Sequence, residues 1–170
     1  MNNNETPRIY VACLAAYNAG LLHGKWIDAN QDEEDIMEEI QTMLKASPEP
    51  FAEEWAIHDY ENFGPVKLSE HESIEKVAEL GQAMAEHGLA AAAYFDENKN
   101  LENFEDSLIG IFTSEIDFAH YWLEQSGHLK FLEESGLSYF FDFAAYARDL
   151  FLDELWSFKI DADQLCVFSH

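Results

Sequence analysis

The sequence predicts an α+β fold, and three observations support this prediction. Apolar side chains alternate along Arg8–Leu14 and Glu53–Tyr60, which is the period of a β-strand. They recur every three to four residues along Asp32–Ala46, which is the period of an α-helix. The chain of 170 residues is 48% hydrophobic and 14% aromatic, so we expect it to fold although a net charge of -25 on its own favours disorder.

The sequence of residues 1–62 predicts a small α+β lobe. The strand Arg8–Leu14 leads through turn residues into a second extended stretch, Leu21–Asp28. The helix Asp32–Ala46 follows, and the prolines after it mark its end. The strand Glu53–Tyr60 completes the lobe.

Residues 63–106 predict a helical lobe. Ser69 and Glu72 have the spacing of a capping box, and apolar residues after this box continue a helical stripe to Gly88. A second, shorter helix is predicted over Leu89–Phe95, where polar residues follow.

Residues 107–170 predict a second α+β lobe. A chain of this length forms one ordinary domain or two to three small lobes, and we expect three. The elements expected in the last lobe are a strand, two helices and two strands: Ser107–Phe112, Ser114–Gln125, Asp142–Glu154, Leu155–Ile160 and Gln164–Phe168.

The negative charge is spread evenly along the chain. No acidic run is longer than the four residues Asp32–Asp35, and there is no acidic tail. At one charge per about 1.7 Å of duplex axis, the charge of the chain equals that of roughly 12 base pairs of DNA. Binding to DNA or to an anionic membrane needs a basic face, so the expected partners are basic. On charge alone, acidity that serves only solubility or a salty cytoplasm is an equal alternative.

The cytoplasm is the expected compartment. The segment Met1–Pro7 lacks the basic and apolar regions of a secretory signal. The longest apolar runs, such as Leu89–Phe95, fall far short of the roughly 20 residues that span a bilayer. Cys13 and Cys166 are isolated, which fits two reduced thiols.

Catalytic signatures are absent from the sequence. It has no GxSxG, no phosphate loop, no GxGxxG and no HExxH, so we expect no catalytic residues and no cofactor. His58, beside Asp59 and Glu61, has the surroundings of a general base, but a half-buried strand histidine is the favoured interpretation.

Two patterns resemble metal sites, and neither is complete. Asp117 and His120 lie at i, i+3, but a di-iron bundle needs that pair twice, so a surface acid and an interface histidine are favoured. Asp96–Asn100 is similar to the start of a calcium loop, but Leu101 stands at the obligatory glycine and Ser107 at the bidentate glutamate. We therefore expect no metal.

Four segments, in the expected order, resemble the ArdA antirestriction family. They are distributed along nearly the whole chain: Ile9–Ile27, Glu53–Glu61, Phe118–Trp122 and Asp142–Leu150. One departure is Ala15–Ala16, where relatives often carry polar or acidic residues.

The resemblance implies a DNA mimic that is not an enzyme. It implies an elongated, curved homodimer of three small lobes, whose carboxylates stand in for phosphates. Its partner would be a type I restriction–modification enzyme, bound in the DNA groove on the specificity and modification subunits, so that incoming DNA escapes cleavage. One alternative is an acidic interaction protein that binds another basic nucleic-acid-binding partner, such as a nucleoid protein or a polymerase. A third possibility is an enzyme with an undetected site at His58 or His120.

Under the family interpretation, many carboxylates contribute and no single one is essential. The acidic residues expected on the DNA-mimic surface are Asp32, Glu33, Glu34, Glu38, Glu39, Glu53, Glu72, Glu75, Glu79, Glu105, Asp106, Glu115, Asp149, Asp153 and Glu154. The residues expected at the dimer interface, by family analogy, are Ile109, Ile111, Phe112, Phe118 and Trp122. For each acid taken singly, an ordinary solvated helix face is the simpler explanation.

Overall fold

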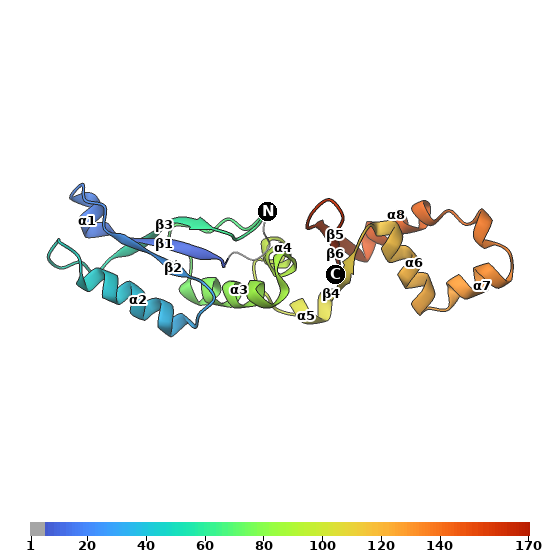
Figure 1. Cartoon of the computed structure of the whole chain (residues 1–170), viewed down its shortest axis with the longest axis horizontal. Coiled ribbons are helices and arrows are strands. Elements are labelled where there is room, and N and C mark those ends of the chain that lie inside the picture. Colours follow the sequence, from blue (N-terminus) through green and yellow to red (C-terminus); the bar gives the residue numbers. More distant parts are fainter. Residues whose placement is uncertain (1–5) are drawn as a thin grey trace. The chain divides into compact units, whose positions relative to one another are not determined.

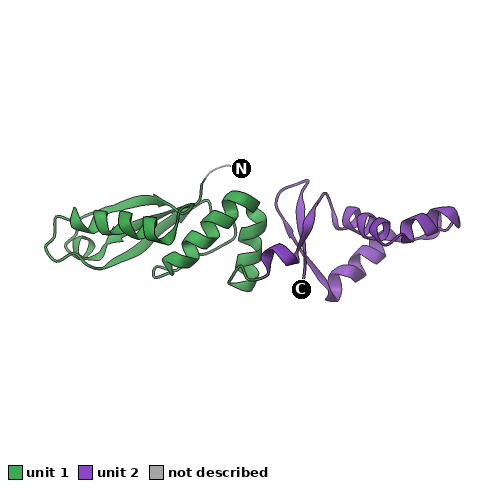
Figure 2. Cartoon of the chain, turned by 90° about the horizontal axis from the view of Figure 1, so that it is seen from below, with its two compact units in different colours: residues 1–102 green, residues 103–170 purple. Residues whose placement is uncertain are grey.

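A computed structural model describes residues 6–170 and divides the chain into two compact units, residues 1–102 and 103–170 (Figure 2). Each unit contains helices and a three-stranded sheet, which confirms the predicted α+β class. The finer division into three lobes and the elongated, curved shape stay predictions. None of the helices in the described residues is long and apolar enough to span a membrane.

Unit 1 is built on an antiparallel sheet with the strand order β2-β1-β3. Its elements are β1 (Arg8–Cys13), α1 (Leu14–Asn18), β2 (Gly24–Asp28), α2 (Glu33–Lys45), β3 (Trp55–Glu61), α3 (Ile74–His87) and α4 (Leu89–Asn98). The helices α2 and α3 lie along one side of the sheet (Figure 1). Ile9 and Val11 of β1 and Ile36 and Ile40 of α2 are fully buried, so the two sequence periods meet in one core.

Two details of unit 1 differ from the sequence prediction. The expected turn after β1 is the short helix α1, which is too short to show a helical period. The predicted capping box forms a turn that does not continue into a helix: Ser69 N donates to Glu72 Oε2 at 3.4 Å, and Ile57 N of β3 donates to the Glu70 carbonyl at 2.9 Å. Ser73 is the N-cap of α3 instead.

Gly81 sets how closely α3 approaches the rest of unit 1. A Cβ atom built on Gly81 would lie 2.2 Å from the carbonyl oxygen of Ala29, the buried residue that follows β2. Because this neighbour is backbone, it cannot rotate away as a side chain would. The helix therefore needs glycine here despite the lower helix propensity of that residue.

Unit 2 is built on a second antiparallel sheet, with the order β4-β6-β5. Its elements are α5 (Phe104–Ser107), β4 (Leu108–Phe112), α6 (Glu115–Gln125), α7 (His128–Glu134), a 3-10 helix (Ser138–Phe140), α8 (Phe143–Asp153), β5 (Leu155–Lys159) and β6 (Leu165–Ser169). The core joins α6 to the sheet through Phe118, Leu155 and Val167. Ser114 and Asp142 cap α6 and α8, since their side chains accept hydrogen bonds from the backbone of the first turn.

The two cysteines are buried free thiols, one in each unit. Burial raises the pKa of Cys166 to about 11. Its thiol lies 3.4 Å from the carbonyl oxygen of Phe158, to which it donates. At neutral pH this cysteine is protonated and a poor nucleophile.

We expect Gly81→Ala to destabilise the protein, although the same change in an ordinary helix is stabilising by about 1 kcal/mol. The added methyl group meets the Ala29 carbonyl, and overpacking of this kind lowers the free energy of unfolding by about 1–3 kcal/mol. Urea unfolding followed by circular dichroism measures the change. Ala85→Gly, at an exposed position of the same helix, calibrates propensity alone. A Gly81→Ala protein as stable as the parent would contradict the close approach.

Candidate functional site: an acidic surface

The proposed acidic residues lie at the surface. Of the fifteen, only Glu39 and Glu72 are partly buried, and no charged side chain in residues 6–170 is fully buried. Both units are strongly negative: unit 1 has 21 acidic and 6 basic residues, a net charge of -15, and unit 2 has 13 and 3, a net charge of -10. Exposed acidic residues therefore occur on each of the two units and are not confined to one element.

Several of these acids form rows on the outer faces of helices. Glu75 and Glu79 of α3 lie one turn apart on the face opposite the buried residues of that helix, and Asp149 and Asp153 of α8 repeat the spacing. Four residues of α-helix rise about 6 Å. Two successive phosphates on one DNA strand are about 3.4 Å apart along the axis, so each row matches roughly the rise of two nucleotides.

An acid at the N-terminal end of a helix stabilises that helix, whereas an acid at the C-terminal end does not. Glu33, Glu34 and Asp35 occupy the first turn of α2, where the helix dipole favours negative charge. That placement has an ordinary structural explanation.

The opposite ends carry acids that the dipole disfavours. The last turns of α4, α6, α7 and α8 contain no basic residue. They hold acids instead: Asp96 and Glu97, Glu124, Glu133 and Glu134, and Asp153. Carboxylates at helix C-termini oppose folding. Lysines offset two of them, because Lys99 Nζ lies 3.0 Å from Asp96 and Lys130 Nζ lies 3.8 Å from Glu134. Within residues 6–170, the other four have no ion pair with a lysine or arginine, so the fold does not explain their placement.

Glu39 differs from the other members of the surface because a lysine offsets its charge. Lys25 Nζ lies 2.5 Å from Glu39 Oε2, and Gln31 Nε2 donates to Glu39 Oε1 at 2.9 Å. The hydrogen bond from Lys25 is the main reason that the pKa of Glu39 is lowered. In the described part of the chain, Glu39 is the one acid of the proposed surface that pairs with a lysine or arginine. Its neighbour Glu38 is exposed.

The patterns that resembled metal or catalytic sites have structural contacts. Asp117 accepts hydrogen bonds from the backbone N and the Oγ1 of Thr113, at 3.0 and 3.1 Å, and His120 stacks on Phe143 with ring centroids 4.0 Å apart. His58 Nε2 lies 3.7 Å from a carboxylate oxygen of Glu70. Within residues 6–170, no three metal-ligating side chains lie close enough together to hold an ion.

The segment resembling a calcium loop is part of a helix end. Asp96, Glu97 and Asn98 belong to the last turn of α4, and Lys99 Nζ lies 3.0 Å from Asp96 Oδ1. Lys99 therefore forms an ion pair with Asp96, the residue that would be the first calcium ligand.

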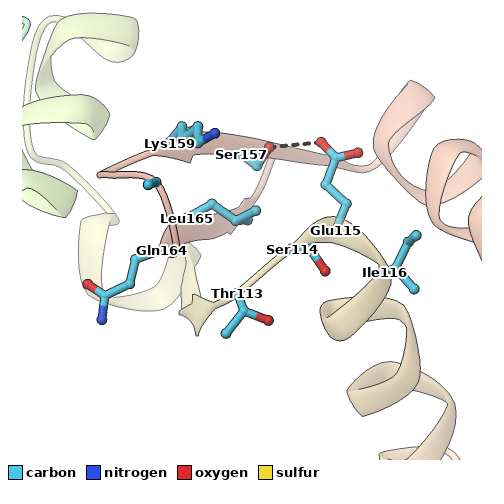
Figure 3. A pocket seen from close by; sticks show the side chains of 9 residues that line it. Thr113, Ser114, Glu115, Ile116, Ser157, Lys159, Gln164 and Leu165 are labelled. Atoms are coloured by element: carbon cyan, nitrogen blue, oxygen red, sulfur yellow. Dashed lines mark hydrogen bonds between the residues drawn. The ribbon is translucent and has the colours of Figure 1, made fainter.

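A cavity of about 410 Å³ lies in unit 2, between the start of α6 and the hairpin of β5 and β6 (Figure 3). Ser157 Oγ donates to Glu115 Oε1 at 3.0 Å across it, and this bond orients one of the proposed acids. The lining contains one lysine and one carboxylate but no histidine or cysteine. This is not a set of residues typical of catalysis.

The residues expected at the dimer interface differ in how far they are exposed to solvent. Ile111 and Trp122 are exposed, whereas Ile109 and Phe112 are half-buried. Phe118 has no exposed surface, because it packs in the core of unit 2 with its ring 5.1 Å from that of Phe112. Phe118 therefore supports this face from inside and cannot itself contact a partner.

Sequence patterns missed four of the most exposed apolar side chains. Leu22 and Phe51 in unit 1 are 92% and 93% exposed, and Tyr139 and Phe140 in unit 2 are 90% and 80% exposed. All four lie outside the long helices and strands, where no period distinguishes an inner from an outer face. An isolated large apolar residue among turn residues is the one sequence signal available for them.

A family model described as antirestriction protein (ArdA) matches residues 9–161. No curated protein matches the chain.

We expect Asp153→Asn to stabilise the protein by about 0.3–1 kcal/mol at low salt, because it removes a negative charge from the C-terminal end of α8. The gain should shrink as salt shortens the Debye length from about 30 Å to about 3 Å. Glu33→Gln, in the first turn of α2, is the matched control with the opposite sign. Urea unfolding at both ionic strengths measures the two changes. A loss of stability in Asp153→Asn would mean that this carboxylate serves the fold.

Proposed function

This chain belongs to the ArdA antirestriction protein family, and from that premise we propose that it is a DNA mimic that inhibits type I restriction–modification enzymes. It occupies the DNA-binding groove formed by the specificity and modification subunits, in the cytoplasm, and blocks cleavage of incoming DNA. It acts by occupying a site and not by catalysis, so one inhibitor blocks one groove.

The observation that carries this proposal is the placement of acids where they oppose folding. Four helices carry carboxylates and no base in their last turns. Acidity that served only solubility would be met as well by acids at helix N-termini, where they also stabilise the fold. A surface that must resemble a polyanion needs charge along the whole length of each helix.

The mechanism follows from the chemistry of a DNA-binding groove. Its lysines and arginines are positioned for phosphate oxygens, and carboxylates can accept the same charge-assisted hydrogen bonds. Complementary fields accelerate the encounter, and helices hold the carboxylates before binding, which lowers the ordering cost.

Binding of this kind is distributed over many weak contacts. An exposed ion pair contributes about 0.2–1 kcal/mol, so the fifteen acids act together and no one of them is essential. Glu39 contributes less than Glu38, because Lys25 already offsets its charge.

We also propose a homodimer formed along β4. This strand is an edge of its sheet, so one of its backbone edges has no partner strand within unit 2. Ile111, on the same strand, is 53% exposed, and Trp122 of α6 is also exposed. Pairing of two β4 strands would cover both features.

We expect the protein to displace duplex DNA from a type I methyltransferase at low salt. The logarithm of the apparent affinity should fall linearly with the logarithm of the salt concentration, as it does for DNA itself. Fluorescence anisotropy of a labelled duplex, measured over a salt series, tests both points.

Two single variants make this test specific to the acidic surface. Glu38→Gln should weaken competition by up to about five-fold, and Glu39→Gln should weaken it less. If folded protein in excess does not displace DNA, the type I groove is not its target, and another basic nucleic-acid-binding protein becomes the leading partner.

We expect Ile111→Asp to convert the dimer into a monomer, because it places a charge on the unpaired edge of β4. Sedimentation at several protein concentrations measures the mass. Leu152→Asp is the matched control, since Leu152 is also exposed but lies on α8. A wild-type protein that is monomeric at micromolar concentration would rule out the dimer.

A further inference from the structure

One end of unit 1 carries four exposed apolar side chains. Leu22 and Phe51 are more exposed than any other large apolar side chain in residues 6–170, and Tyr17 and Leu21 nearby in sequence are 54% and 43% exposed. We call Tyr17, Leu21, Leu22 and Phe51 the apolar end of unit 1. Apolar side chains exposed together mark interaction sites more often than single ones do.

The two connections that carry these residues meet at the same end of the sheet. Cys13 N donates to the carbonyl oxygen of His23 at 2.9 Å, and Leu14 N donates to that of Glu54 at 3.0 Å. The end of β1 is therefore flanked on one side by the connection that holds Leu22 and on the other by the connection that holds Phe51. Figure 1 shows α1 and the connection from α2 to β3 together at this end.

Hydrogen bonds hold both connections in place. His23 Nε2 donates to the carbonyl oxygen of Met43 at 2.7 Å, which ties the start of β2 to the end of α2. The Sγ of Cys13 lies 3.4 Å from Ser47 Oγ, and Ser47 Oγ accepts from Glu49 N at 3.2 Å. The apolar side chains thus project from an organised scaffold, which lowers the ordering cost of binding.

The charge of this end selects the kind of partner. The connection Ala46–Glu54 contains Glu49, Glu53 and Glu54 and no basic residue. These carboxylates, on the connection that holds Phe51, would be repelled by DNA and by an anionic membrane. They complement a protein surface on which lysines or arginines border an apolar recess.

We propose that Leu22 and Phe51 insert into such a recess on the type I enzyme, beside its DNA-binding groove. This inference rests on the function proposed above and extends it. DNA presents phosphates to the groove but has no counterpart of an exposed leucine and phenylalanine. The apolar end therefore makes a contact that DNA cannot make, and it lets the inhibitor distinguish this enzyme from other basic proteins.

The proposed apolar contact differs from the contacts of the acidic residues in its dependence on salt concentration. Burial of apolar surface depends weakly on moderate salt, whereas phosphate-like contacts depend on it steeply. Removal of the apolar end should lower the affinity at every salt concentration and leave the slope against salt unchanged. Burial of one such side chain corresponds to about ten-fold or more in affinity.

The test is the Leu22→Ser/Phe51→Ser double variant in the DNA-displacement assay over a salt series, with the full chain. We expect competition at least ten-fold weaker than that of the wild type, with the same salt slope. Glu53→Gln/Glu54→Gln should instead make the slope shallower. Leu152→Ser, an exposed apolar residue of unit 2, should change neither quantity. Urea unfolding and sedimentation check that every variant has the stability and the mass of the wild type.

The outcomes separate this inference from the proposed function. If the wild type displaces DNA and the double variant does so equally well, the apolar end makes no contact and the inference is wrong. If the double variant loses mass, the apolar end binds a second copy of the chain, which also overturns it. If the wild type does not displace DNA, the proposed function fails and this inference fails with it.

Discussion

Repulsion among 34 carboxylates is the constraint that the rest of this structure must accommodate. With nine lysines and arginines in the whole chain, most of that charge has no basic partner. The fold meets it by keeping every described charged side chain at the surface and placing the apolar residues in a compact core within each unit. Aromatic side chains contribute to the core of unit 2, where the ring of Phe118 packs against those of Phe112 and Phe151.

In the proposed complex, the acidic surface and the apolar end of unit 1 have different physical roles. The acidic residues are numerous and exposed, and an exposed ion pair is weak, so we expect binding through them to tolerate single changes. The apolar end consists of few residues on connections that are hydrogen-bonded to the ends of β1 and α2. In the proposed complex, the acidic surface resembles DNA and accelerates association, and the apolar end provides selectivity among basic proteins.

Periodicity predicted the elements that have one buried face. The strands β1 and β3 and the helices α2, α6 and α8 lie where alternating or helical patterns placed them, because a buried face imposes its period on the sequence. Short elements such as α1 and α7 were missed, and α7 contributes no buried residue that could mark it. The capping box at Ser69 and Glu72 was misleading, because pairing of Glu70 with β3 could not be read from local sequence. The acids could be named from the sequence, but which of them are offset, as Glu39 is by Lys25, depends on contacts between elements distant along the chain.

The two buried thiols, one in each unit, allow the opening of each core to be measured separately. Cys13 lies at the end of β1 in unit 1 and Cys166 lies within β6 of unit 2, and both have no exposed surface. A thiol reagent can reach either one only when the core around it opens. The rates at which the two cysteines are labelled in the unmodified protein therefore compare the opening of the two cores, and a complex that covers one unit would slow the labelling of that unit's thiol alone.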